Sequence, residues 1–218
     1  MNKCIAVLCA LFCILNSSLS FAFDNGDWQI WSDQKVEASF NKDWKIWVEE
    51  EERFGDNVSA LYYLHTEAGI WHGLTDWLSL GVNYRHISIK VHDKWKEEYM
   101  PNVYATVGWD LFGLKFDDRN RFEYRIHKHV RGSLRYRNRL TITAPLKWTA
   151  LKMQPYVSNE IFIDSYRQKF DQNRLASGLK FNIIEHLDAD VYYMWLAVES
   201  KSKWTSTNIV GLKVQVSF

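Results

Sequence analysis

The sequence predicts an all-β protein: an antiparallel transmembrane β-barrel of about 10 strands (10–12), preceded by a cleaved signal peptide. The last residues, 210–218, alternate strictly between apolar side chains (Val210, Leu212, Val214, Val216, Phe218) and small or polar ones. Successive strand residues point to opposite faces, so this segment has one apolar and one polar face. Similar alternation recurs along the chain, and no stretch after residue 22 approaches the 18 uncharged apolar residues of a membrane-spanning helix.

Residues 1–22 have the pattern of a secretory signal peptide. Lys3 supplies a positive charge, and the apolar stretch from Cys4 to Leu15 is too short to cross a bilayer as a helix. Ser20-Phe21-Ala22 then offers small residues at the spacing that signal peptidase requires, so we expect cleavage after Ala22. Residues 23–218 would form one barrel domain. A cytoplasmic N-terminus that is merely apolar is the alternative.

The composition excludes several kinds of protein. The chain has 27 basic and 26 acidic residues, and Lys3 lies in the signal segment, so the mature chain is formally neutral and nucleic acid is not an expected partner. All three cysteines also lie in that segment, which leaves no disulfide and no cysteine metal site in residues 23–218. Aromatic residues make up 16% of the chain, which suits a protein with aromatic belts at a membrane interface.

The alternating runs give the expected strands in order. They cover 28–39, 43–54, 59–72, 76–89, 97–111, 114–127, 132–145, 152–164, 172–184, 187–198 and 205–218. Eleven is an odd number, whereas bacterial single-chain barrels have even numbers of strands. The first run is the weakest, because polar residues follow Trp31. We therefore favour ten full strands from residue 43 onward, with 24–40 as a partial strand, an inserted segment or part of a twelve-strand arrangement.

The connections are expected to differ between the two ends of the barrel. Short turns near 41–43, 73–76, 111–113, 146–148 and 185–186 would face the periplasm, and Phe218 would end there. Longer loops near 55–57, 91–97, 128–132, 164–171 and 199–203 would face outward. Aromatic residues near the turns are expected at the lipid interface, or in the core of a soluble sandwich as the alternative: Trp44, Trp71, Trp77, Trp109 and Phe218.

The polar faces of several strands are strongly charged. A basic side chain facing lipid near the midplane costs about 2–4 kcal/mol, so these faces are expected to point into the lumen. The predicted ladder of lumen charges is Glu49, Glu51, Arg53, Arg119, Arg121, Glu123, Arg125, Arg135, Arg137, Arg139, Glu160 and Arg174. Pairing of Arg with Glu would fill most of a narrow barrel. The alternative is an anion path along Arg119, Arg121, Arg135, Arg137 and Arg139.

Several short motifs resemble, in their order, an uncharacterised family of exported bacterial proteins catalogued as domain of unknown function 2490. The motifs are Trp28-x-x-Trp31, Glu49 to Phe54, Gly81-Val82-Asn83-Tyr84-Arg85, Asn120 to Arg125, Arg135-Tyr136-Arg137, Ser158-Asn159-Glu160, and Gln172 to Leu175 with Gly178. The similarity covers nearly all of the mature chain. It implies an outer-membrane barrel and supplies no established activity or functional residues.

One pattern suggests an enzyme. His86 and Ser88 share the apolar face of their strand, an arrangement similar to the His-x-Ser of outer-membrane lipid A deacylases, whose site opens toward lipid. A third group must orient the histidine, and Glu98, or Glu97 beside it, is the candidate on the next strand. However, Ile89 stands where that family has a polar Asn. A histidine and a serine at the lipid interface, without catalysis, is the favoured interpretation.

These observations predict a protein of the bacterial outer membrane that is non-enzymatic and serves as a structural barrel or a narrow pore. The alternatives are a lipid A-modifying hydrolase using His86 and Ser88, and a soluble exported binder resembling lipocalins. Outer-membrane lipids and, through the C-terminal strand, the barrel-assembly machinery are the expected partners; the sequence does not predict the oligomeric state. No cofactor and no metal site are expected, although the acidic run Glu49–Glu52 could hold calcium at the rim.

Overall fold

The computed structural model describes residues 25–128, 130–146, 149, 151–165, 169–200 and 202–218. The expected signal peptide, residues 1–22, lies outside the described residues. Within the described part of the chain, no helix has the length and apolar character needed to cross a membrane.

Eleven strands follow one another through the described residues, and each pairs in antiparallel fashion with the next. They are β1 (Asp27–Ser39), β2 (Trp44–Gly55), β3 (Ala60–Gly73), β4 (Leu78–Val91), β5 (Lys94–Leu111), β6 (Leu114–His127), β7 (Val130–Thr143), β8 (Gln154–Asp164), β9 (Lys169–Ile184), β10 (Leu187–Ser200) and β11 (Lys203–Ser217). Every run of alternating residues that the sequence suggests as a strand is one. A 14-residue strand tilted by about 40° spans about 35 Å along the barrel axis, enough to cross a hydrocarbon core of about 30 Å.

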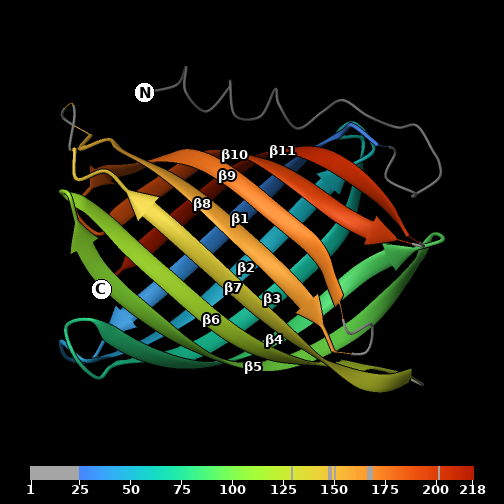
Figure 1. Ribbon diagram of the computed structural model, residues 1–218, viewed down its shortest axis with the longest axis horizontal. Coiled ribbons are helices and arrows are strands. Elements are labelled where there is room, and N and C mark those ends of the chain that lie inside the picture. Colours follow the sequence, from blue (N-terminus) through green and yellow to red (C-terminus); the bar gives the residue numbers. More distant parts are fainter. Residues whose placement is uncertain (1–24, 129, 147–148, 150, 166–168, 201) are drawn as a thin grey trace, which may run out of the picture.

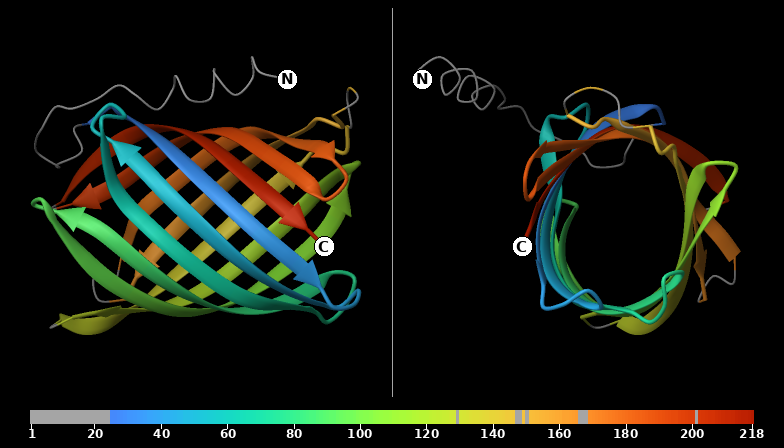
Figure 2. Two further views of the ribbon diagram at one scale, coloured as in Figure 1. Left: turned by 180° about the vertical axis from the view of Figure 1, so that it is seen from behind. Right: turned by 90° about the vertical axis from the view of Figure 1, so that its left-hand side faces the viewer.

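The sheet closes into a barrel through a parallel seam between β1 and β11. In an up-and-down barrel with an odd number of strands, the first and last strands run in the same direction, so they can only pair in parallel. The seam extends from Asp27 opposite Thr207 to Glu37 opposite Ser217, and Ser39 N donates to Phe218 O at 2.8 Å. Figure 1 shows the tilted strands, and the end-on view in Figure 2 shows the complete ring.

The strand count lies within the expected range of 10–12, but the preference for ten full strands was wrong. Residues 27–39 form a complete strand that pairs on both sides. The polar run after Trp31 is accommodated because its inward members find partners in the lumen. Lys213 Nζ donates to Asp33 at 3.0 Å, and Lys35 Nζ donates to Glu37 at 2.7 Å.

Gly26 lies at one end of the barrel and Phe218 at the other, and each end takes its name from that residue. The Gly26 end holds Gly26 and the connections β2–β3, β4–β5, β6–β7, β8–β9 and β10–β11; the Phe218 end holds Phe218 and the other connections. The expected contrast in loop length was wrong. Residues 91–97 are mostly strand, joined by the tight turn His92–Asp93 with φ of 49° and 60°, and the longest connection joins β7 to β8 at the Phe218 end.

The outer wall is mainly apolar, with side chains such as Ile46, Val48, Leu80, Val82 and Leu212 left 40–57% exposed. In water this arrangement would leave a continuous apolar surface unburied, whereas it suits contact with hydrocarbon. Polar side chains interrupt the wall in several places, among them Glu50 and Thr66 on β2 and β3 and a patch on β6 and β7. There Asn138 donates to Asp118 at 2.5 Å, and Tyr136 donates to Asn120 at 2.5 Å. These bonds satisfy part of the patch internally.

Four of the five expected interface aromatics face outward or lie at the rim. Trp44, Trp77, Trp109 and Phe218 are 41–70% exposed; Trp109 stacks on Phe116 with 5.3 Å between ring centroids. Trp71 was wrongly expected among them. It lies on the same face of β3 as the buried His65 and Glu67, opposite the inward Lys45, whose Nζ lies 5.4 Å from its ring centroid.

Candidate functional site

The charged faces of the strands point into the lumen. The predicted ladder of Glu and Arg lies on the inner faces of β2, β6, β7, β8 and β9, and its most buried members are no more than 9% exposed: Glu51, Arg53, Arg121, Glu123, Arg137 and Glu160. Taking charges of this kind out of water requires partners. The lumen supplies these partners in three successive levels, which follow one another from the Gly26 end to the Phe218 end.

The first level, the buried layer, lies toward the Gly26 end and holds two clusters of buried side chains, one on β1, β10 and β11 and one on β3 to β5. Its large members are Trp31, Tyr62, Tyr63, Met100, Phe162, Met194 and Ile209, all at most 6% exposed. Polar groups within it are satisfied, since Tyr62 Oη and Trp31 Nε1 both donate to Gln29 Oε1, at 2.8 and 3.0 Å. These buried side chains therefore occupy part of the lumen toward the Gly26 end.

Arginines join this layer to the next level by stacking on its rings. The guanidinium carbon of Arg53 lies 3.6 Å from the ring centroid of Trp31 and 3.9 Å from that of Tyr63. Arg137 and Arg174 lie over Phe162 at 4.6 and 4.7 Å. A guanidinium over an aromatic face is stabilised by the ring quadrupole, so the apolar layer and the charged level support each other.

The second level is an ion-pair network around three buried glutamates, Glu67, Glu123 and Glu160. Glu160 receives hydrogen bonds from three arginines on three strands: Arg137 at 2.8 Å, and Arg119 and Arg174 both at 3.3 Å. Glu123 pairs with Arg135 and Arg137, both at 2.6 Å. Glu67 pairs with Arg85 and lies 3.5 Å from Arg121. Each carboxylate is therefore shared by more than one guanidinium.

Two pairs of arginines face each other directly across the β6–β7 ladder. Arg119 is opposite Arg139, and Arg121 is opposite Arg137. Like charges at opposed positions of an antiparallel pair are destabilising. Among the described residues, Arg139 has no ion pair within 4.0 Å, whereas the other three reach a glutamate. We call these four residues the arginine wall.

The third level is a cavity of about 780 Å³ that extends from the network to the rim at the Phe218 end. Eleven basic and seven acidic side chains of the described residues line it. The basic ones are Lys35, Arg53, Arg85, Arg119, Arg121, Arg137, Arg139, Lys152, Arg174, Lys180 and Lys213; the acidic ones are Asp33, Glu49, Glu51, Glu67, Glu160, Asp188 and Asp190. Glu123 and Arg135 do not line the cavity, and their opposite charges cancel because they form an ion pair. The lining thus carries an excess of four positive charges.

Glycines on the inner faces help to keep this cavity open. Tyr192 lies opposite Gly211, and its ring occupies the place where a Cβ on that glycine would stand; Tyr104 and Tyr156 lie in the same way over Gly81 and Gly178. Without a side chain beneath it, each ring can lie flat against the barrel wall. All three tyrosines line the cavity rather than fill it.

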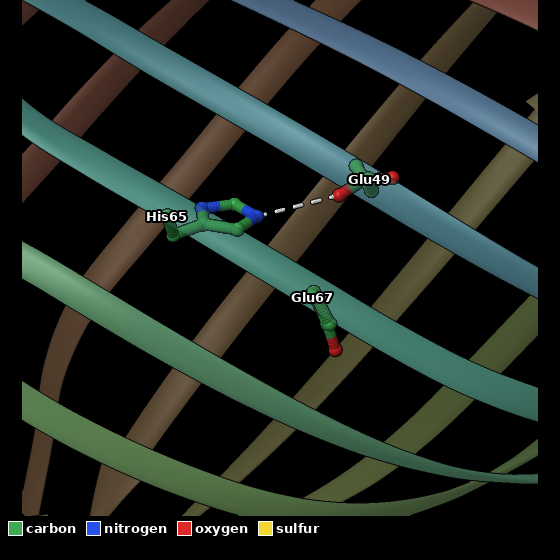
Figure 3. Close-up of side chains that lie close together, drawn as sticks. All are labelled: Glu49, His65 and Glu67. Carbon is green, nitrogen blue, oxygen red and sulfur yellow. Dashed lines mark ion pairs between the residues drawn. The ribbon is translucent and has the colours of Figure 1, made fainter.

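The opposite side of the cavity carries acidic groups whose charges are largely matched. Glu49 and Asp33 share Lys213, at 2.7 and 3.0 Å from its Nζ, and Glu51 pairs with Arg53. His65 lies among them with its side chain fully buried and its Nε2 3.6 Å from Glu49 (Figure 3). Its Nδ1 lies 3.7 Å from Glu51. Neither ring nitrogen has a hydrogen-bond partner in the described residues.

The group Glu49, His65 and Glu67 has the donor atoms for a divalent cation, all within 4.8 Å of one another. The surrounding side chains disfavour a bound cation. The oxygens of Glu67 already accept from Arg85, Asn83 and Asn102, and Glu49 accepts from Lys213. A cation would have to displace these donors beside three fixed positive charges, Arg85, Arg121 and Lys213, so the cluster carries no metal-site assignment.

His86 and Ser88 lie on the outer face of β4, near the Gly26 end, as the alternative enzymatic hypothesis requires. Glu97 on β5 lies opposite Ser88, and its Oε1 is 3.9 Å from His86 Nε2. Glu98 points the other way, into the lumen, where Arg125 Nε donates to it at 2.6 Å. Within the described residues, no hydrogen bond joins Ser88 to His86. The structure therefore does not bring Glu98 to the other two residues.

Several residues of the lumen escaped the sequence analysis. They are Asp33, His65, Glu67, Arg85 and Lys213, all inward-facing. The alternation of side chains between the two faces of a strand could have identified them. Each occupies an inner position of a strand whose other face is mainly apolar. They were overlooked because each stands between uncharged neighbours rather than in a run of charges such as 117–125.

Comparisons with known proteins support the fold. The family model described as "Protein of unknown function (DUF2490)" matches residues 28–207. A comparison with curated proteins gives no match. Among solved structures, LpxR from Salmonella typhimurium has a similar fold, with a TM-score of 0.50 and 7% sequence identity over 80% of this chain and 83% of that one. At this identity the likeness concerns the fold alone.

Proposed function

The chain belongs to the DUF2490 family, and from this premise we propose that it is a non-enzymatic barrel of the bacterial outer membrane with a charged lumen that does not conduct. One observation carries the proposal: the strand arginines of the predicted ladder point into the lumen, whereas the outside of the barrel is mainly apolar. Placing each of these arginines on a lipid-facing wall would cost about 2–4 kcal/mol near the midplane, so the distribution fits hydrocarbon outside and a polar interior.

The proposed orientation places the Phe218 end in the periplasm. The C-terminal strand then carries the alternating residues and terminal aromatic that suit recognition by the barrel-assembly machinery, and outer-membrane lipids contact the apolar wall. The cavity, which reaches the rim at this end, would be accessible from the periplasm. Residues 1–22 would direct export and be removed.

The buried layer supports a closed barrel over a conducting pore. Met100 and Ile209 are fully buried and Phe162 is 1% exposed, as in a packed core. Ions crossing the barrel would have to pass these side chains after leaving the cavity. The lumen is therefore best described as a one-ended recess, and the charged network as the element that holds its floor.

Two measurements test the proposal. After expression in a bacterium, the mature chain should remain in the outer-membrane fraction through a high-salt wash and an alkaline carbonate wash. Purified in detergent and added to planar bilayers, it should insert without producing regular conductance steps. A folded monomer in detergent-free buffer would overturn the membrane assignment, and reproducible single-channel steps would overturn the closed lumen.

A lipid-modifying hydrolase is the second candidate, favoured by one specific observation. His86, Ser88 and Glu97 lie together on the outer face of adjacent strands, where an acyl chain of a lipid A-like substrate could reach them. The arrangement lacks the hydrogen bond between base and nucleophile that activates a serine, although such bonds often tighten only with substrate bound. Analysis of lipid A from cells with and without the protein separates the two candidates.

A further inference from the structure

We propose that the arginine wall of the cavity is a binding site for a small anionic ligand bearing a phosphate-type oxyanion, which enters from the Phe218 end. The inference deepens the proposed function, because it assigns a ligand class to the recess of the closed barrel. It rests on three independent features of the lumen: the placement of like charges, the charge balance of the lining, and unsatisfied buried donors.

The first feature is the placement of Arg119, Arg121, Arg137 and Arg139 at directly opposed positions of the β6–β7 ladder. Side chains that merely fill a barrel gain most when acidic and basic residues alternate across the ladder. Here both opposed positions on β6 and β7 hold arginine. Such a pattern costs stability in the empty protein, and an anion placed between the strands offsets that cost.

The second feature is the charge balance of the cavity. Its lining carries eleven basic and seven acidic groups among the described residues, although the mature chain as a whole is formally neutral. The acidic groups on β1 and β2 are matched locally by Lys213 and Arg53, so the excess lies across the cavity on β6 to β9. A recess with low-dielectric walls and one sign of excess charge concentrates ions of the opposite sign.

The third feature is a pair of buried donors without acceptors. Arg121 and Arg137 are 4% and 6% exposed, and the Nε atom of each has no hydrogen-bond partner in the described residues. Both side chains line the cavity. A buried donor left unpaired costs about 1–3 kcal/mol, which an oxyanion accepting from these groups would recover.

The chemistry of the donors selects the ligand class. A guanidinium presents a planar fork of N–H groups that matches two oxygens of a phosphate, and several forks in one wall suit a tetrahedral oxyanion. The volume of about 780 Å³ exceeds the needs of a bare phosphate and lies in the range of small-molecule sites. Trp31, Trp47 and Tyr156 also line the cavity and offer contact area for an organic part attached to the phosphate.

The same chemistry could come from a free phosphorylated solute or from a lipid headgroup, and binding experiments can separate them. The mature chain, folded in detergent micelles at constant ionic strength, would be titrated calorimetrically with inorganic phosphate and, separately, with a short-chain phosphatidic acid. Tryptophan fluorescence provides a second readout, because Trp31 and Trp47 line the cavity. We expect saturable one-to-one binding of inorganic phosphate; binding of the lipid alone would overturn entry of a soluble anion.

Arg139→Gln is the most informative variant. Arg139 has no ion pair among the described residues, so its removal orphans no carboxylate and the barrel should fold. We expect at least a tenfold weaker affinity for phosphate. Lys94→Gln removes one positive charge at the exposed start of β5, at the Gly26 end, and should leave the affinity within twofold of wild type.

The outcomes separate this inference from the proposed function. No saturable binding by the wild-type chain, or equal affinity in the Arg139→Gln variant with a native circular dichroism spectrum, would overturn the phosphate site. Neither result bears on membrane residence, which the carbonate wash tests. Conversely, a chain that binds phosphate but is released by the wash would overturn only the outer-membrane assignment.

Discussion

Arg119 lies directly opposite Arg139 across the antiparallel ladder of β6 and β7, and both side chains line the same cavity. Glu160 lies opposite Arg139 on β8, yet its oxygens accept from Arg119, Arg137 and Arg174. Glu67 and Glu123 reach Arg121 and Arg137, but among the described residues no carboxylate lies within 4.0 Å of Arg139. The repulsion that remains between the opposed arginines should lower the stability of the ligand-free barrel, and unfolding experiments can measure that effect.

Replacing Arg139 with Gln should raise the stability of the barrel. The substitution removes one like-charge contact and breaks no ion pair among the described residues, so we expect a gain of about 0.5 kcal/mol in the free energy of unfolding. Urea unfolding in detergent micelles, followed by tryptophan fluorescence, measures it. A residue that only filled space would behave oppositely, with a loss of stability, and that result would contradict a wall built to hold an anion.

Phe162 at the floor of the cavity should be needed to close the barrel. It is 1% exposed and carries three arginines over its ring, so Phe162→Ala should cost about 3–5 kcal/mol and open a path past the buried layer. We expect conductance steps in planar bilayers that the wild type lacks. Ile163→Ala, on the outer face of the same strand and 39% exposed, is the matched control. Steps from both variants would point to general damage.

Much of this fold follows from the sequence because strand period and turn residues are local signals. The alternating runs located all eleven strands, and the cost of charge in lipid placed the arginines in the lumen. The closure could not be foreseen in the same way. The partner of Asp27 is Thr207, and a parallel pairing over that separation leaves no short-range pattern in either strand.

The misplaced residues have physical reasons too. Trp71 was assigned to the interface because it stands near a turn, but its position relative to His65 and Glu67 puts it on the inner face. The short connection His92–Asp93 was taken for part of a long loop because the charged residues after it resemble a loop; in the structure they belong to the exposed start of β5. The cavity was unforeseen because it depends on tyrosines lying over glycines of neighbouring strands.

Ser88 should be dispensable for the chemistry of the outer membrane. Ser88→Ala leaves the lumen untouched, because the side chain lies on the outer face opposite Glu97. Mass spectra of lipid A should be identical for cells that express wild type, the variant or no protein. Loss of an acyl chain that depends on both the protein and Ser88 would establish the hydrolase instead.

Divalent cations should not bind the group formed by Glu49, His65 and Glu67. Their oxygens are engaged with Arg85 and Lys213, so neither zinc nor calcium should raise the unfolding temperature, and a chelator should not lower it. Differential scanning calorimetry with each ion, and with EDTA, checks this. A rise with zinc that His65→Ala abolishes would show that the buried imidazole is a ligand.

Replacing Glu160 with Gln should lower the stability of the barrel and raise its affinity for phosphate. Its buried carboxylate is the common partner of arginines from three strands, and breaking a buried ion pair from one side costs about 3–5 kcal/mol. Glu160→Gln should therefore lower the free energy of unfolding by about this amount. It should also tighten phosphate binding several-fold, because a negative charge shared by Arg119 and Arg137 of the arginine wall is gone. Glu185→Gln, at a turn where the side chain is 90% exposed, controls for charge alone and should change neither quantity.

If Glu160→Gln weakened phosphate binding while circular dichroism showed an intact barrel, the glutamate would be orienting the arginines for the ligand rather than competing with it. The arginine wall would then need this carboxylate to bind the anion.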